Sequence, residues 1–91
     1  MKIQGEAMTM QNALQLKKAG QAAIDAGDSE FDLSEVKTVD SSAVSVLLSW
    51  IRHAKKKAIS LRIRRVPVAL DSLLSLYGIH ALLEPFIFSE N

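Results

Sequence analysis

Few side chains in this 91-residue sequence have the types and spacing needed for catalysis. The chain has two histidines: His53 stands beside lysines on an expected helix, and His80 follows the expected end of another. General acid–base catalysis needs several titratable groups that converge, and no His-x-x-x-His, Gly-x-Ser-x-Gly or phosphate-loop pattern is found. The four glycines are scattered and cysteine is absent. The sequence therefore predicts no enzyme, no cofactor and no metal site.

One local pattern, Asp40-Ser41-Ser42, is compatible with two explanations. Aspartate and serine favour helix starts because their side chains accept early backbone N–H bonds, which alone explains the pattern. The alternative is a hydroxyl exposed at the positive end of a helix, where a phosphate would add close to two negative charges and could make or break a partner contact. Ser42, Ser45 and Ser49 then recur at helical spacing, and they predict a small, flat side that another protein could approach closely.

The elements that position these serines follow from hydrophobic periodicity and from turn residues. A stripe of apolar residues and an N-cap at Asp40 predict a long helix, with Ala43, Leu47, Ile51 and Ala54 buried. Strict alternation predicts a strand over residues 59–64, with one apolar and one basic side. Further strands are expected over residues 2–5, 30–36 and 86–88. Further helices are expected over residues 9–26 and from Pro67 to a Schellman ending at Gly78 and Ile79, followed by one helical turn over residues 80–84.

Alternating strands and helices predict one α/β domain over residues 1–91. We expect a mixed, mostly parallel four-stranded sheet, because successive strands are joined by helices that cross over. The strands alternate apolar and polar residues and are not apolar throughout, so the helices should pack mainly on one face of the sheet. Leu70, Leu73, Leu74 and Tyr77 should form the apolar side of the helix that Pro67 opens.

Charge is unevenly distributed, which suits a protein partner better than a uniform polyanion. Residues 1–40 carry four Lys/Arg and seven Asp/Glu, a net charge of −3, whereas residues 41–91 carry seven and three, a net charge of +4. The main basic residues are Lys55–57, Arg62, Arg64 and Arg65. These cations are either simply solvated, or they face an acidic protein surface or lipid head groups. Neither a signal peptide nor a membrane-spanning run is recognisable, so we expect a cytoplasmic protein. The net charge of the whole chain is only +1, so we do not expect it to bind nucleic acid.

Three segments, residues 31–36, 39–44 and 54–57, resemble the STAS family. That family includes bacterial anti-sigma-factor antagonists and the small MlaB-like subunit of the phospholipid-transport ABC complex. Residues 73–79, Leu-Leu-Ser-Leu-Tyr-Gly-Ile, and the apolar run 44–51 are most similar to the Mla-type members. The resemblance covers residues 3–88 and implies a STAS-like fold without catalytic activity.

The resemblance also implies what Ser41 does. In the antagonists, the hydroxyl residue after the aspartate is phosphorylated by the anti-sigma kinase; in Mla-type subunits, it contacts the ATPase subunit. We therefore expect an accessory subunit that docks on the ATPase of a lipid ABC transporter, reaching the inner membrane only through that partner. The partner-binding residues would be Asp40, Ser41, Ser42, Ser45 and Ser49. The alternative is an anti-sigma-factor antagonist regulated by phosphorylation of Ser41.

Two departures from the family pattern are visible. Ala43 stands where the family usually has a glycine, two residues after the hydroxyl, which weakens the case for kinase recognition. We expect the family's first strand, which precedes residues 3–6, to be missing: either the chain starts late or that edge is built otherwise, and a lost edge strand would leave backbone groups unpaired.

Overall fold

The computed structural model describes residues 1–88; the last three residues of the expected domain lie outside the described range. Its helices follow the expected order, but the strict alternation is wrong, because residues 7–8 and 38–39 form two strands that were not expected and no helix separates residues 30–32 from 38–39. The elements are β1 (Ala7–Met8), α1 (Ala13–Asp25), β2 (Glu30–Asp32), β3 (Thr38–Val39), α2 (Ser41–Lys56), β4 (Arg62–Arg64), α3 (Val68–Leu76), α4 (His80–Leu83), the 3₁₀ turn η1 (Glu84–Phe86) and β5 (Ile87–Phe88). The long helix is found within one residue of its expected bounds, whereas the strands are shorter than expected.

The expectation of one four-stranded sheet is wrong in detail. The described strands form two parallel sheets, one of β1 and β3 and one in the order β2-β4-β5. The strand expected over residues 2–5 is reduced to a single bridge between Lys2 and Asp32. Gly5 adopts a positive φ of 90°, and Lys37 and Thr38 both donate their N–H groups to the Glu6 carbonyl. This turn interrupts the ladder between the N-terminal segment and the chain that follows β2, so one sheet becomes two.

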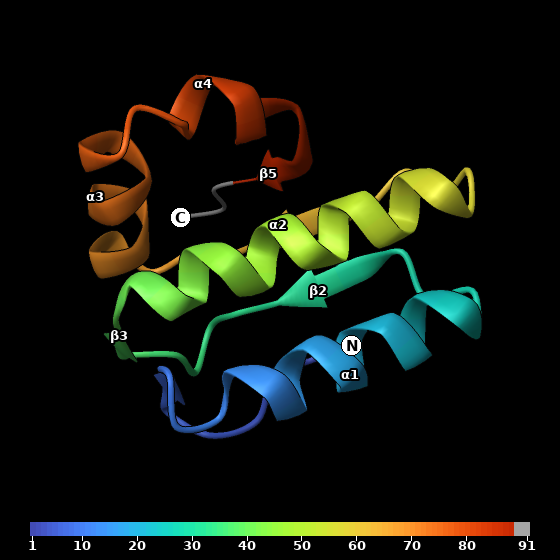
Figure 1. Ribbon diagram of the computed structural model, residues 1–91, viewed down its shortest axis with the longest axis horizontal. Helices are drawn as coiled ribbons and strands as arrows, with labels where there is room; N and C mark the ends of the chain where they lie inside the picture. Colours follow the sequence, from blue (N-terminus) through green and yellow to red (C-terminus); the bar gives the residue numbers. More distant parts are fainter. Residues whose placement is uncertain (89–91) are drawn as a thin grey trace.

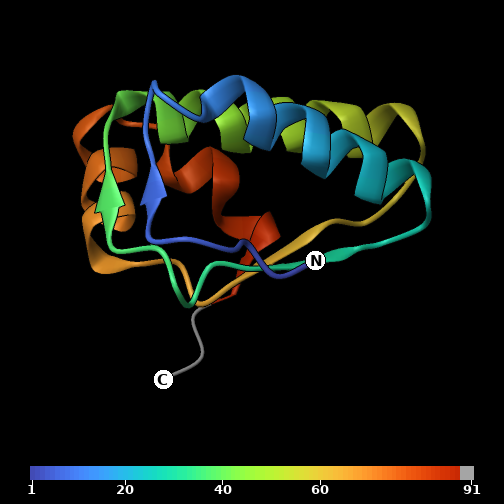
Figure 2. The same cartoon turned by 90° about the horizontal axis from the view of Figure 1, so that it is seen from below.

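Helices α1 and α2 lie side by side on one face of the strands, as expected (Figures 1 and 2). They run in the same direction, with α3 near the end at which α2 begins and in contact with β3. Alternation along the strands accounts for this layering: Phe31 and Ile63 are fully buried, whereas Glu30 and Arg62 are exposed. The opposite face of the strands therefore remains open and charged.

Trp50 lies at the centre of the core, where the sequence-based stripe did not place it. Its ring meets Phe31 edge to face, with the centroids 4.9 Å apart, and its Nε1–H donates to the Leu16 carbonyl over 3.0 Å. Gly20 on α1 leaves the space that the indole occupies, because a Cβ there would lie 2.0 Å from Trp50 Nε1. The contact between α1 and α2 therefore depends on a large side chain facing a residue without one.

On α3, Leu70 and Leu74 are fully buried, while Leu73 is only partly buried. Tyr77 is 50% exposed, so its expected place on the apolar side of the helix is wrong. It occupies the C-cap, where the chain turns away from the core. The expected Schellman ending is confirmed: Gly78 has a φ of 69°, and the Ile79 N–H donates to the Leu74 carbonyl over 3.1 Å.

Candidate functional site

The site is built around the Asp40 carboxylate, which links two segments far apart in the sequence. Its Oδ1 accepts the Ser42 N–H over 2.8 Å, which confirms the expected N-cap of α2. Its Oδ2 accepts the Met10 N–H over 3.0 Å. The Met10 hydrogen bond lowers the pKa of Asp40 most; partial desolvation raises that pKa, and the bonds from Ser42 lower it again. Asp40 therefore holds the turn before α1 against the start of α2.

Ser41 is the first residue of α2 and is exposed. Among the described side chains and backbone groups, its hydroxyl has no hydrogen-bond partner, so it is open to a ligand or a modifying enzyme. Two large apolar side chains are exposed nearby, Met10 at 77% and Leu14 at 64%. Both belong to the segment that Asp40 ties to the start of α2, at the end where the parallel helices α1 and α2 begin (Figure 1). Exposed apolar side chains that lie together offer area that a protein partner can remove from water.

The other expected serines occupy two different environments. Ser45 is exposed one helical turn after Ser41, and Ser49, one turn further, is half-buried and accepts a hydrogen bond from Gln21 Nε2 over 3.1 Å. Ser41, Ser45 and Ser49 thus form one line along the outer side of α2, here called the serine stripe, and Ser49 at its far end borders α1. Ser42 lies at the edge of the same face, is half-buried and donates its N–H to Asp40. The four expected serines therefore share one face of α2, on which Ser41 and Ser45 are exposed, with Asp40 at the helix start as their support.

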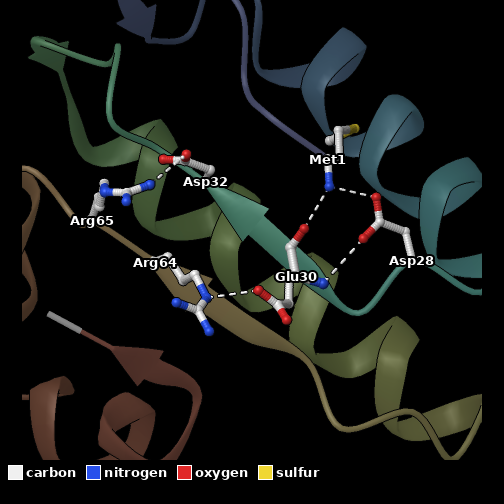
Figure 3. Close-up of polar contacts among 6 residues, drawn as sticks. All are labelled: Met1, Asp28, Glu30, Asp32, Arg64 and Arg65. Atoms are coloured by element: carbon white, nitrogen blue, oxygen red, sulfur yellow. Dashed lines mark hydrogen bonds and ion pairs between the residues drawn. The ribbon is translucent and has the colours of Figure 1, made fainter. Parts of the chain in front are cut away.

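Arg64 and Arg65 are not free to attract an acidic partner, because acids of the same chain pair with them. Arg64 Nε lies 2.7 Å from Glu30 Oε1, and Arg65 Nη1 lies 2.9 Å from Asp32 Oδ2 (Figure 3). On the same open face, the terminal amino group of Met1 contacts the Asp28 carboxylate and the Glu30 carbonyl (Figure 3). These pairs make the open face of the strands a compensated charge network, which favours the solvated interpretation of these two arginines.

The two histidines connect helices. His53 Nε2 lies 2.8 Å from Asp25 Oδ1, between α2 and α1, and His80 Nε2 lies 2.7 Å from Asp71 Oδ1, between α4 and α3. His53 is the main cause that lowers the pKa of Asp25. In the part of the chain that the structure describes, no three His, Asp or Glu side chains are grouped closely enough to hold a metal ion.

Sequence reasoning missed Met10 and Leu14. Periodicity carried a signal for Leu14, because Leu14 shares its helical spacing with the polar residues Lys18, Gln21 and Asp25. Met10 gave no such signal, since it falls in a stretch expected to be helical. Their exposure results from the actual start of α1 at Ala13 and from the turn that Asp40 holds.

A family model described as "Mlab, STAS domain" matches residues 1–84. The chain therefore belongs to the STAS domain family. STAS domains are generally non-catalytic regulatory or binding domains that mediate protein–protein interactions. A comparison with curated proteins gave no sequence match.

Solved structures of similar fold include two connected with anti-sigma factors. A Thermotoga maritima protein proposed to be an anti-sigma factor antagonist superposes with a TM-score of 0.75 at 16% identity, covering 99% of this chain and 78% of the other. The anti-sigma factor antagonist SpoIIAA in its unphosphorylated form superposes with a TM-score of 0.66 at 13% sequence identity. The match covers 99% of this chain and 77% of SpoIIAA. A sulfate transporter family protein from Wolinella succinogenes superposes with a TM-score of 0.71 at 22% sequence identity. The match covers 97% of this chain and 73% of that protein. At such identities these similarities show the fold.

None of the helices described has both the length and the apolar character needed to cross a bilayer.

Proposed function

We propose that this chain is an accessory subunit that docks on the ATPase of a lipid ABC transporter through the start of α2. The exposed, unpaired hydroxyl of Ser41 beside exposed Met10 and Leu14 is the observation that carries the proposal. The family model described as Mlab and the Mla-like ending of α3 point to a transporter subunit as the partner. The chain itself would work in the cytoplasm and reach the membrane only through that partner.

The surface at Ser41 has the features that docking requires. Its backbone is rigid, because Asp40 fixes both the helix start and the adjoining turn. The small serines at 41 and 45 let a partner approach the helix closely, and the apolar side chains of Met10 and Leu14 supply area to be removed from water. A bulky charged residue at position 41 would block this approach while leaving the core intact.

The direct test is co-purification with the ATPase subunit of the lipid ABC transporter from the same genome, followed by titration calorimetry. We expect the original chain and Ser41→Ala to bind, and Ser41→Arg to lose at least about tenfold in affinity. Ser60→Arg, at an exposed serine on the opposite end of the molecule from Ser41, is the matched control and should bind normally. Melting temperatures of all variants should agree within a few degrees, because none of these side chains is in the core.

The second candidate function is that of an anti-sigma-factor antagonist regulated at Ser41. It is favoured by the free hydroxyl at the positive end of a sixteen-residue helix, which would stabilise a phosphate. Incubation with the cognate anti-sigma kinase and ATP should then add the mass of one phosphate, and Ser41→Ala should prevent it. A chain that is phosphorylated at Ser41 and captures a sigma-factor regulator, but no ABC ATPase, would contradict the transporter proposal.

A further inference from the structure

The serine stripe continues beyond Ser49 into a basic hollow that the sequence-based site did not include. An open hollow of about 280 Å³ lies between α1 and α2 and is lined by Gln21, Ser49, Arg52, His53 and Lys56. Ser41, Ser45, Ser49, Arg52 and Lys56 follow one another at spacings of three or four residues, so they form one face of α2. At 1.5 Å per residue, this face is roughly 22 Å long, from the Ser41 hydroxyl to the last turn.

The cations of the hollow are not compensated inside the chain. Arg52 and Lys56 are exposed, and neither has an ion-pair partner among the side chains that the structure describes. The neighbouring acid, Asp25, is already engaged, with its Oδ1 2.8 Å from His53 Nε2 and 3.6 Å from Lys57 Nζ. Lys56 lies in the last turn, where the helix dipole favours a cation, but Arg52 lies one turn earlier. Like charges one turn apart repel each other, so an anion between them would relieve this repulsion.

The less exposed groups in the hollow offer further hydrogen bonds to an anion. Ser49 Oγ accepts from Gln21 Nε2 over 3.1 Å, which leaves the Ser49 O–H available as a donor. A guanidinium, an ammonium and a hydroxyl that converge on one hollow can bind a carboxylate through charge-assisted hydrogen bonds. The hollow has room for an acidic side chain, whereas a flat bilayer surface would reach its rim cations but not Ser49.

We propose that this hollow receives an acidic side chain of the protein that docks on the serine stripe. This inference deepens the proposed function, since it gives the partner's chemistry: a segment that is small or apolar opposite Ser41 and Ser45 and carries Asp or Glu opposite Arg52 and Lys56. The apolar end of the surface supplies buried area, and the basic end fixes the register and accelerates association.

The test uses Arg52→Gln/Lys56→Gln, with Lys18→Gln/Lys55→Gln as the matched control. Both double variants remove two exposed positive charges, but Lys18 and Lys55 do not line the hollow. Binding to the ATPase subunit should weaken about tenfold in the hollow variant and less than about twofold in the control. Affinity of the original chain should also fall between about 0.05 M and about 0.3 M salt, and this dependence should be smaller in the hollow variant. Equal affinity of the two double variants would overturn the inference and leave the proposed function standing.

A second arm is independent of the ATPase. An acetylated and amidated hexaglutamate peptide, titrated into the ¹⁵N-labelled chain, should shift the amide resonances of Arg52, His53 and Lys56 and the side-chain amide of Gln21. These shifts should disappear in Arg52→Gln/Lys56→Gln and persist in the control. If the peptide binds here but the ATPase does not bind the chain, the proposed function fails and the inference stands. Saturation by inorganic phosphate without any peptide shift, or binding only to phosphatidylglycerol vesicles, would overturn the inference.

Discussion

At the residue scale, single positions determine both the shape of the core and the state of the docking surface. Gly20 and Trp50 form a complementary pair, because the indole fills the space that any side chain at position 20 would occupy. Asp40 uses both carboxylate oxygens to hold the surface, and Ser41 is left with a free hydroxyl. The residue that supports the site and the residue that we propose acts in it are therefore adjacent in sequence but have separate roles.

Gly20→Ala should destabilise the fold by about 1–3 kcal/mol, because the new methyl group must displace a fully buried indole. Urea unfolding followed by far-UV circular dichroism measures this loss, since that signal does not depend on Trp50, the single tryptophan. In a Trp50→Phe background the smaller ring leaves room, so the same substitution should cost less. An equal cost in both backgrounds would show that the loss does not arise from this contact.

At the element scale, helix endings show where local sequence and tertiary structure disagree. All three long helices end in a hydrogen-bond pattern of the Schellman type, with Gly27 after α1 and Gly78 after α3 at positive φ. After α2, the equivalent residue is Ala58, at a φ of 57°, and the Ile59 N–H still donates to the Ala54 carbonyl over 2.9 Å. The packing of α2 and the following strand imposes this turn on a residue that does not favour it.

Ala58→Gly should therefore stabilise the protein by about 1 kcal/mol, since glycine adopts a positive φ without the steric cost of a Cβ. Ala22→Gly, at an exposed position inside α1, is the matched control and should destabilise by about 1 kcal/mol. Differential scanning calorimetry should show melting temperatures that move in opposite directions. A shift in the same direction would contradict a strained turn at Ala58.

Leu47→Ala on α2 should lower the free energy of unfolding by about 2–4 kcal/mol, because Leu47 is fully buried and truncation leaves a cavity. Leu73→Ala on α3 should cost about 1 kcal/mol, since Leu73 only packs against the edge of the core. Chemical denaturation measures both values. Equal losses would mean that the two helices contribute equally to the core.

At the scale of the whole molecule, carboxylates couple the folded state to pH. The pKa values of Asp25, Asp28, Asp32 and Asp40 are all lowered from the ordinary value of 3.8. For Asp25, the His53 hydrogen bond is the largest cause. For Asp28 and Asp32, burial raises the pKa, but the sum of the hydrogen bonds and nearby cations outweighs it. A group with a lowered folded-state pKa stabilises the fold above its unfolded pKa, and this contribution is lost as pH falls through the folded value.

The stabilisation that these four carboxylates supply should therefore be fully present above about pH 5 and be lost progressively as pH drops below 3.8. Asp40→Asn keeps a capping oxygen but removes the charge, so its stability deficit at pH 7 should shrink at pH values below those at which Asp40 is protonated. Thermal unfolding by circular dichroism across this range checks both expectations. A deficit that stays the same at low pH would show that the charge of Asp40 does not contribute.

The sequence by itself determined the local features of this protein. The order of the helices, the Asp40 cap, the glycine endings after α1 and α3 and the family resemblance all follow from short patterns, because backbone geometry and capping depend on neighbouring residues. Such patterns place Ser41 at the start of a helix, but they do not show what surrounds it.

Only the tertiary structure decided which residues meet. It divided the expected sheet at Gly5, buried Trp50 against Gly20, exposed Met10 and Leu14 beside Ser41, and paired Arg64 and Arg65 with acids of the neighbouring strand. It also placed Gln21 of α1 against the Arg52 turn of α2. These outcomes depend on contacts between segments far apart in the chain, and those contacts form only when several elements pack around one core.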